Sequence, residues 1–165
     1  MEIGRRFSLK YVFIGLYIVA FLVYIIVGLQ PAEAANYNIV AELSIPSIGL
    51  QSDVASLKLN NGALDTPDTI VGSYSGAENK SLLIGHSTTV FKNLNNVKIG
   101  DIIIYNKKEY VVYKRDLVQK DDILMPRLLK KEDTDTIVIM TCAGKLLKNG
   151  DATHRFLLTA EKVEE

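Results

Sequence analysis

The sequence contains few of the side chains that usually carry enzyme chemistry. Its 165 residues include one cysteine, Cys142, and two histidines, His86 and His154. A single cysteine excludes an internal disulfide, so the folded part of the chain depends on its hydrophobic core. Any thiol chemistry in this chain therefore belongs to Cys142.

An excess of one charge is also absent. The chain carries 19 basic and 19 acidic residues. Once Glu2, Arg5, Arg6 and Lys10 are set aside, the remainder has a net charge of −2. No basic stripe with interleaved aromatic residues occurs in it, which argues against nucleic-acid binding. Internal repeats and low-complexity segments are absent too, and the length suits one domain with additions.

One long apolar run lies near the N-terminus. Residues 11–29 contain no charged side chain and are long enough to cross a hydrocarbon core of ~30 Å as a helix. Because basic residues precede the run, the positive-inside rule places the N-terminus in the cytoplasm. We expect a basic cytoplasmic tail at 1–10, a single-pass membrane anchor at 11–29, a linker at 30–38 and an extracellular domain at 39–165. A signal peptide cleaved near "AEA" (32–34) is the alternative, and it also exports the domain.

Beyond residue 38 the pattern favours short strands over helices. Runs rich in Val, Ile and Tyr alternate with turn residues, and helical periodicity is weak. Short helical turns are expected at 89–97 and 123–131, where Pro126 suits a first helical turn. This spacing is typical of a mainly β protein, either a barrel or a sandwich. The expected strands are Ile39–Ile45, Val54–Leu59, Ser81–His86, Ile102–Tyr105, Tyr110–Val118, Thr136–Cys142 and His154–Val163.

Cys142 ends the apolar run "TIVIMTC" and is followed by Ala143 and Gly144. One interpretation is a buried thiol in a core strand, because free cysteine is among the most buried residue types. The other is a nucleophile at a strand end, where small residues leave room for another backbone. A nucleophilic thiol needs a base or a cation nearby that favours the thiolate.

Two residues offer that support. His86 follows an apolar run in "LIGHS", and Arg155 interrupts the last apolar strand. The arginine is a permanently charged planar fork that can hold a carbonyl or an oxyanion. Because neighbouring strand residues point to opposite faces, His154 and Arg155 cannot both face one pocket. A nucleophile, an acid/base and a charge stabiliser together suit acyl transfer at a peptide bond.

The order of four motifs resembles the sortases, which are membrane-anchored cysteine transpeptidases of bacterial surfaces. The motifs are "LIGHS", "FKNLNNVKIGDIIIY", "VIMTC" and "HRFLLTAEKV", and the resemblance covers roughly residues 39–163. The sortase cysteine motif Thr-Leu-X-Thr-Cys is partly kept. Thr141 and Cys142 match it, whereas Val138 and Ile139 replace its first Thr and its Leu.

The resemblance implies a closed sortase-type β-barrel with a few short helices, and no cofactor. Cys142 would attack a C-terminal sorting-signal peptide, often of the Leu-Pro-X-Thr-Gly type, and form a thioacyl intermediate. His86 would exchange a proton with the leaving and incoming amines, and Arg155 would hold the oxyanion. The acceptor would be an amino group of a cell-wall precursor or of a pilin lysine, so that surface proteins are anchored or polymerised.

Substrate-binding residues are expected beside the cysteine and in the connection 119–135. Ordinary packing is the alternative for the apolar residues of that connection. Some sortases bind calcium near this region, but the acidic residues here lack calcium-loop spacing, so we expect a solvated rim and no metal site. The substrate-binding candidates are Thr141, Ala143, Ile123, Leu124, Met125 and Leu128, and the acidic residues are Asp121, Asp122, Glu132, Asp133 and Asp135.

Other classes fit the sequence less well. Papain-like and amidase cysteine hydrolases place the cysteine before the histidine, often at a helix start. The L,D-transpeptidases have His-Gly two residues before the cysteine and Arg close after it, and "IMTCAGK" has neither. A membrane-tethered β-domain that only binds a partner stays open, because fold does not fix function. Reactivity of the Cys142 thiol in the folded protein separates that alternative from an enzyme.

Overall fold

The computed structural model describes Gly15, Ile18 and residues 37–60, 63–64, 66–75, 79–148 and 150–164. Residues 37–165 form one compact unit. The predicted cytoplasmic tail, the anchor and most of the linker lie outside the described residues, apart from Gly15 and Ile18. Within the part of the chain that the structure describes, no helix is both long and apolar enough to cross a membrane.

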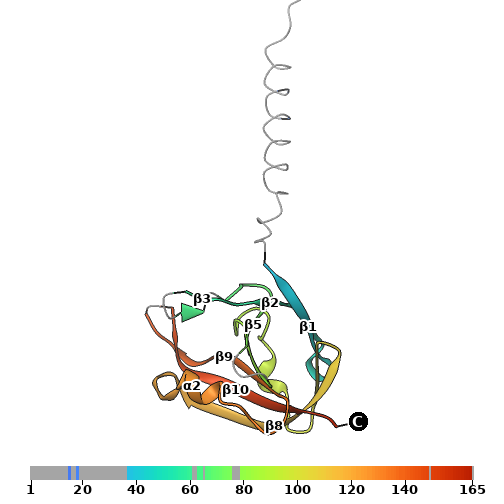
Figure 1. The fold of residues 1–165 in the computed structure, drawn as a ribbon. Coiled ribbons are helices and arrows are strands. Elements are labelled where there is room, and N and C mark those ends of the chain that lie inside the picture. The colour runs from blue at the N-terminus through green and yellow to red at the C-terminus, as the bar shows by residue number, and fades with distance from the viewer. Residues whose placement is uncertain are drawn as a thin grey trace, which may run out of the picture. The chain divides into compact units, whose positions relative to one another are not determined.

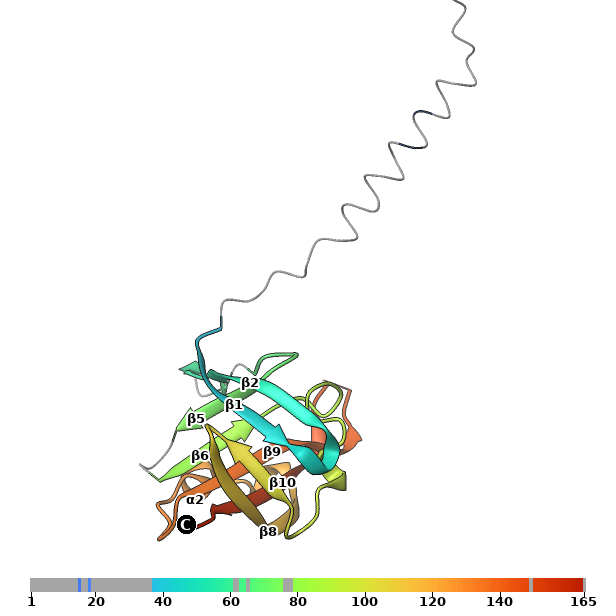
Figure 2. The same cartoon turned by 90° about the vertical axis from the view of Figure 1, so that its right-hand side faces the viewer.

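The strands close into a barrel in the order β1-β2-β5-β6-β9-β10-β8-β7 (Figures 1 and 2). Most neighbours are antiparallel, while β2 with β5 and β6 with β9 are parallel. The barrel confirms the prediction of a mainly β fold. The strands are β1 (Ile39–Ile45), β2 (Leu50–Ser56), β5 (Val71–Ser75), β6 (Lys80–Ile84), β7 (Ile102–Tyr105), β8 (Lys108–Gln119), β9 (Thr136–Leu146) and β10 (Ala152–Lys162).

Short elements fill the connections between these strands. A two-stranded sheet pairs β3 (Leu59–Asn60) with β4 (Ala63–Leu64). The helical elements described between residues 37 and 164 are single turns, as the weak helical periodicity predicts. They are the 3-10 helices η1 (Pro46–Ile48), η2 (Leu94–Asn96) and η3 (Lys120–Asp122), and the α-helix α2 (Met125–Leu128).

Alternation of side chains along the strands builds the core. On β9, Ile137 and Ile139 belong to the interior cluster together with Leu158 of β10. Val138 faces the other way and packs with Leu82 and Leu157. The segment around α2 covers this outer cluster through Met125, Leu128 and Leu129. The sequence predicts a fully buried run over Thr136–Cys142. β9 is buried on both faces from Thr136 to Ile139, whereas Met140 and Cys142 are only partly buried, so the prediction is wrong at the C-terminal end of the run.

Several predicted strands differ from the observed ones by one or two residues at their ends, and one is displaced further. The sequence favours Val54–Leu59, whereas β2 begins at Leu50 and ends at Ser56. Leu57 then turns inward: it is buried, and its backbone N–H donates to the Ser73 carbonyl at 2.8 Å. Its side chain occupies the space beside Gly72, where a Cβ would lie 2.5 Å from Leu57 Cδ1. Burial of one leucine across a glycine therefore ends the strand before its apolar pattern ends.

A buried lysine ties the connection between β8 and β9 to the barrel. The Lys80 side chain is 5% exposed, and its Nζ lies 2.6 Å from Glu132 Oε1. The neighbouring Asn79 side chain donates to the carbonyls of Glu132 and Thr134, and the Asn79 carbonyl accepts from Thr136 N–H at 2.9 Å. The same connection carries α2, so this contact fixes one end of the segment that covers the outer cluster.

We expect Lys80→Met to loosen that connection. The methionine keeps the apolar stem but leaves Glu132 without its cation. We expect the free energy of unfolding to fall by about 1–2 kcal/mol. The loss is no larger because water still reaches the Glu132 carboxylate. Hydrogen exchange of residues 129–135 should accelerate. The matched control is Lys108→Met, which removes the more exposed Lys108–Asp135 pair and should cost less than about 1 kcal/mol. Equal losses in both variants would contradict a special role for Lys80.

The Lys80–Glu132 pair also has a predictable pH dependence. The Lys80 ammonium lowers the pKa of the Glu132 carboxyl below its ordinary value. A carboxyl whose pKa is lowered in the folded state stabilises the protein above its unfolded-state pKa. Its contribution is lost as the pH falls through the folded-state pKa. Unfolding titrations should therefore show the difference between the wild-type chain and Lys80→Met shrinking in acid.

Candidate active site

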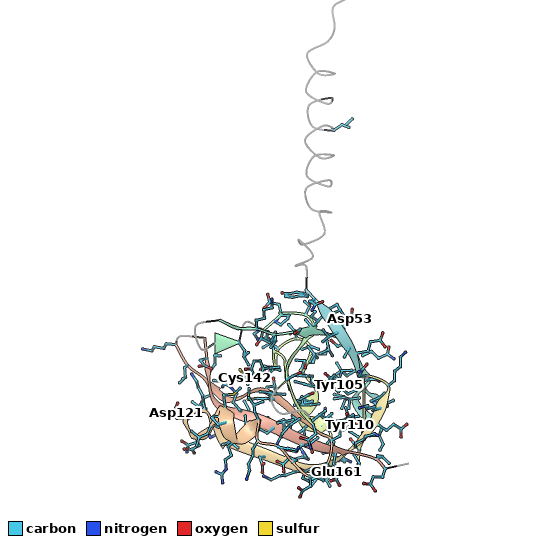
Figure 3. All side chains as sticks on the ribbon, viewed as in Figure 1. Asp53, Tyr105, Tyr110, Asp121, Cys142 and Glu161 are labelled. Carbon is cyan, nitrogen blue, oxygen red and sulfur yellow. The ribbon has the colours of Figure 1, made fainter. Side chains whose placement is uncertain are left out.

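Cys142 lies near the end of β9 and is partly exposed. Figure 3 labels its position on the barrel. It shares the outward face of β9 with Val138 and Met140, because strand residues two apart point to the same side. Gly144, two residues later, has φ +81°, and a Cβ there would lie 2.5 Å from Thr153 Oγ1. The glycine therefore lets β10 approach closely just beyond the thiol.

Arg155 lies directly opposite Cys142 in the β9–β10 register. The register shifts by one residue between Ala152 and His154, so that Ala152 pairs with Leu146 but Arg155 pairs with Cys142. Without this irregularity Cys142 would face Phe156, on the other face of β10. A single irregularity thus decides that the guanidinium, and not the phenyl ring, shares the face of the thiol.

The Arg155 side chain is held in place by several hydrogen bonds. Its Nη1 donates to the carbonyls of Ala152 and His154, each at 3.0 Å. Its Nη2 donates to Asp151 Oδ1 at 2.7 Å, and only 15% of the side chain is exposed. A guanidinium anchored in this way presents its remaining donors in a fixed direction.

His86 follows the end of β6 and lies next to Gly85. Its Nε2 donates to the Thr66 carbonyl at 3.3 Å and lies 3.6 Å from Asp68 Oδ1. A Cβ at Gly85 would lie 2.6 Å from Val90 Cγ1 and 2.7 Å from the Phe91 ring, so only glycine fits there. The tight approach of Phe91 to Gly85 fixes the backbone that carries the histidine.

A cavity of about 420 Å³ brings the three candidate catalytic residues together. His86 follows β6, Cys142 lies in β9 and Arg155 lies in β10, and they are separated by 56 and 13 positions in the chain. Apolar side chains form most of the remaining wall. The lining residues are Leu64, Thr66, Ile84, Gly85, His86, Lys120, Met125, Met140, Thr141, Cys142 and Arg155.

Thr141 contributes to the frame of this cavity. It is buried, and its hydroxyl donates to the Gly85 carbonyl at 2.7 Å. This bond joins the residue before Cys142 to the residue before His86. The hydroxyl predicted to contact substrate is therefore already bound to backbone, and it fixes the spacing between the strand ends that carry the thiol and the imidazole.

A second cavity of about 470 Å³ reaches Cys142 from another side. Ala143 lines this cavity and not the first. The Arg115 guanidinium lies 5.5 Å from the centre of the Phe156 ring and donates to the Asn95 carbonyl at 2.8 Å. Phe91 and Phe156 form an aromatic wall of this cavity. The sequence does not predict this wall, because its residues come from segments far apart in the chain. The lining residues are Ser87, Phe91, Lys92, Asn95, Leu117, Thr141, Cys142, Ala143, Gly144 and Phe156.

The apolar residues predicted in the 119–135 connection divide between two cavities. Met125 lines the cavity of Cys142. Ile123, Leu124 and Leu128 instead line a separate cavity of about 420 Å³, whose wall also includes Lys80. These three residues are thus not brought to the thiol, and Leu128 packs on the outer cluster, as the packing alternative expects.

His154 points away from the cavity that holds Arg155. Its Nδ1 shares a hydrogen bond of 2.8 Å with the Thr153 hydroxyl, and it pairs with Ala143 in the register. This is the outcome that strand alternation predicts. Of the two histidines, His86 is the one whose side chain lines a cavity together with Cys142.

An ionic cluster beside Arg155 has no counterpart in the sequence reasoning. Asp151 accepts from Arg155 and also forms an ion pair with Lys120, the first residue of η3. These two cations hold the pKa of the Asp151 carboxyl well below its ordinary range. The spacing of Asp151 and Arg155 was visible in the sequence, but the approach of Lys120 depends on the fold.

The acidic residues of the connection form no metal site in the described residues. Glu132 binds Lys80, and Asp135 binds Lys108 at 3.2 Å. No group of three potential ligands occurs among the residues that the structure describes. The lysines therefore supply the positive charge next to these carboxylates.

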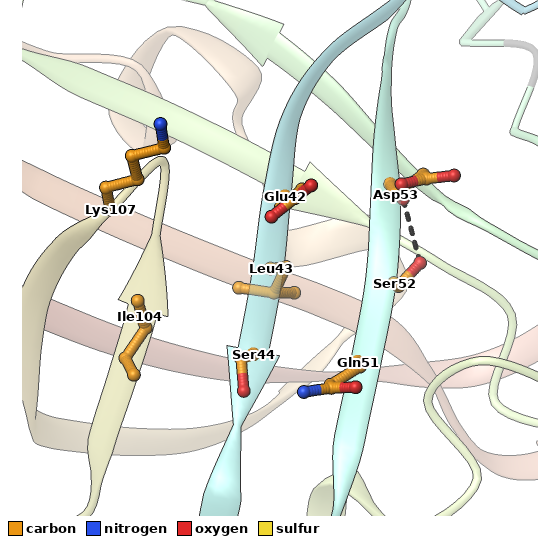
Figure 4. Close-up of a pocket in the computed structure, with 8 residues that line it drawn as sticks. All are labelled: Glu42, Leu43, Ser44, Gln51, Ser52, Asp53, Ile104 and Lys107. Atoms are coloured by element: carbon orange, nitrogen blue, oxygen red, sulfur yellow. Dashed lines mark hydrogen bonds between the residues drawn. The ribbon is translucent and has the colours of Figure 1, made fainter.

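A further cavity of about 470 Å³ lies across the barrel from β9, between β1, β2 and β7 (Figure 4). Its charged side chains are Glu42, Asp53 and Lys107. The figure shows Glu42 and Asp53 on neighbouring strands with Ser44, Gln51 and Ser52, and Lys107 on the turn after β7. It contains neither a thiol nor an imidazole. The nucleophile candidate belongs to the other side of the barrel.

Comparison with known proteins agrees with this geometry. The family model described as "Sortase domain" matches residues 43–163. No curated protein sequence matches the chain. Sortase A from Corynebacterium diphtheriae superposes with a TM-score of 0.61 at 23% identity, over 80% of this chain and 64% of that one. This chain thus spans just under two thirds of that protein's length.

Sortases with other names superpose equally well. Sortase C-1 from Actinomyces oris gives a TM-score of 0.59 at 25% identity, over 82% of this chain and 83% of that one. Sortase C1 from Streptococcus suis gives a TM-score of 0.61 at 20% identity, over 78% of this chain and 75% of that one. The likeness therefore extends to proteins named sortase A and sortase C alike. Since the family model matches most of the chain, this protein belongs to the sortase family.

Proposed function

We propose that this protein is a cysteine transpeptidase that cleaves a C-terminal sorting-signal peptide and transfers it to an amine. The observation that carries the proposal is the meeting of Cys142, His86 and Arg155 at one cavity. A thiol, an imidazole and a guanidinium are the groups that acyl transfer needs: a nucleophile, a proton carrier and an oxyanion partner.

The reaction would proceed in two acyl-transfer steps. The Cys142 thiolate attacks the scissile carbonyl carbon, and Arg155 donates hydrogen bonds to the resulting oxyanion. Protonated His86 gives its proton to the leaving amine as the peptide C–N bond breaks, which leaves a thioester on Cys142. An incoming amine then attacks the thioester and gives a proton to His86, and the thiolate departs. Water replaces the amine when no amine is present.

Access to the thiol supports a reaction with two substrates. Cys142 forms part of the wall of two cavities, so the acyl donor and the amine can reach it from different sides. The donor would be an LPXTG-like sorting signal of a surface protein. The acceptor would be a cell-wall precursor or a pilin lysine. Residues 11–29 would anchor the enzyme, with the barrel on the extracellular side.

Mass spectrometry tests the proposal directly. The chain is incubated with a library of C-terminal sorting peptides, and a thioacyl adduct on Cys142 is sought. A folded protein whose thiol forms no adduct and resists a small thiol-specific electrophile until denaturation would favour the non-catalytic binding domain instead.

The two histidines give a matched pair of variants. His86→Ala should lower the rate of peptide cleavage by about 100-fold, because a general acid and base contributes on the order of 10²–10⁴. Labelling of Cys142 by the electrophile should slow as well, because a nucleophilic thiol needs a base or a cation nearby. His154→Ala should change cleavage less than about threefold, because its side chain lines neither the thiol cavity nor the second one. An inactive His154→Ala beside an active His86→Ala would reverse the assignment.

A further inference from the structure

Asp151 connects three elements around the cavity of Cys142. It lies in the last turn before β10, four residues ahead of Arg155. One carboxylate oxygen, Oδ1, accepts from Arg155 Nη2 at 2.7 Å and from the Ala152 N–H at 2.7 Å. The other oxygen, Oδ2, forms the ion pair with Lys120 of η3. The Asp151 and Lys120 side chains are 23% and 44% exposed, so the cluster lies at the edge of the cavity.

We propose that Asp151 is a positioning residue that fixes the guanidinium of Arg155 for the oxyanion, with Lys120 offsetting its charge. The inference rests on the proposed function of Arg155. Two features support this role: the hydrogen bond from Arg155 to Asp151, and the charge balance of Asp151, Arg155 and Lys120.

The contacts determine the direction of the guanidinium. Two backbone carbonyls, those of Ala152 and His154, hold Nη1. Among the described residues, Asp151 is the one that holds Nη2, through a charge-assisted bond that is about twice as strong as a neutral one. Without it the planar group can rotate about its bonds and present its donors in other directions. Misplacement by about 1 Å can cost on the order of 10²-fold in rate.

The charges explain why a second cation is present. An arginine paired with one aspartate forms a neutral pair, and its attraction for a developing oxyanion is weakened. Lys120 brings the net charge of the three side chains back to +1, and it lines the cavity of Cys142. The arrangement thus combines a fixed guanidinium with a positive potential at the site where negative charge develops.

NMR tests the positioning role without any substrate. In the full chain labelled with ¹⁵N-arginine, the Nη resonances of Arg155, assigned by their loss in Arg155→Lys, should be split by restricted rotation. Asp151→Asn should merge them, and Asp151→Glu should keep them at least partly split. The matched control is Asp116→Asn, which removes a different carboxylate of similar exposure, paired with Lys114 at 2.7 Å, and should leave them unchanged. Unchanged splitting in a folded Asp151→Asn would overturn the inference.

Kinetics test whether Asp151 acts through Arg155. Asp151→Asn should lower kcat for peptide cleavage by about 10- to 100-fold with KM within about threefold. Lys120→Met should lower it by a smaller factor, because the guanidinium stays in place. In the Arg155→Ala background, Asp151→Asn should have no further effect. A further loss in that background would overturn the inference.

The two proposals can fail separately. A wild-type chain that cleaves no sorting peptide would contradict the proposed function, while the NMR measurement would still decide whether Asp151 fixes the guanidinium. Unfolding midpoints of all variants separate a local effect from loss of the fold. If Asp151→Asn does not fold, the same measurements are made on Asp151→Glu. This variant keeps the negative charge and changes only the distance that the carboxylate extends from the backbone.

Discussion

Cys142→Ala should abolish cleavage of sorting-signal peptides, with a loss beyond detection, at least about 10³-fold. The chain has no second cysteine, so no other thiol can form the acyl intermediate. Because hydrogen bonds from β6 and β10 hold β9 on both sides, loss of one partly exposed sulfur should leave the barrel intact. We expect the free energy of unfolding to change by less than about 1 kcal/mol.

Cys142→Ser provides the matched control for this prediction. It restores a hydroxyl nearly in the position of the sulfur, but a hydroxyl ionises far less readily than a thiol, so cleavage should stay undetectable. Peptide hydrolysis, the mass of the acyl adduct and the unfolding midpoint are measured on the same preparations. Cleavage above about 1% of the wild-type rate in a pure alanine variant would show that Cys142 is not the nucleophile.

The sequence predicts the strands whose side chains alternate clearly or whose apolar runs are long. β1 and β7 have the predicted bounds, and β9 extends the predicted run to Leu146. It does not predict β5, Val71–Ser75, whose "VGSYS" contains a glycine and two serines. Residues Val71 to Ser73 are nevertheless buried, because β2 and β6 flank the strand on both sides. Burial by neighbours, and not propensity, makes this segment a strand.

The sequence predicts the positions of the site residues only where it predicts the positions of the strands. His86 and Cys142 each lie two residues beyond the last β6–β9 pair, Ile84 with Met140, so the parallel pairing of these strands brings them close together. The choice between the two faces of β10 depends on the one-residue shift beyond Ala152, which no count of residues between Cys142 and Arg155 reveals. The approach of Lys120 to Asp151 likewise depends on the pairing of β8 with β10.

Arg155→Ala should lower kcat/KM for peptide cleavage by about 10³-fold or more. Loss of one oxyanion donor typically costs 10²–10³, and this side chain also supplies the fixed positive charge beside the thiol. The variant should fold, since the side chain faces a cavity and not the interior cluster.

Arg155→Lys should not restore full activity. The guanidinium uses Nη1 for two backbone carbonyls and Nη2 for Asp151, and its planar fork still has donors left for a substrate. A lysine has one nitrogen with three donors, which the Ala152 and His154 carbonyls and Asp151 would occupy. We therefore expect recovery to less than about 10% of the wild-type rate. The matched control is Arg115→Lys on β8, measured as hydrolysis without an added amine, where the rate should change less than about threefold. Full recovery in Arg155→Lys would mean that the charge alone is needed, and that the hydrogen bonds which orient the guanidinium contribute nothing to the reaction.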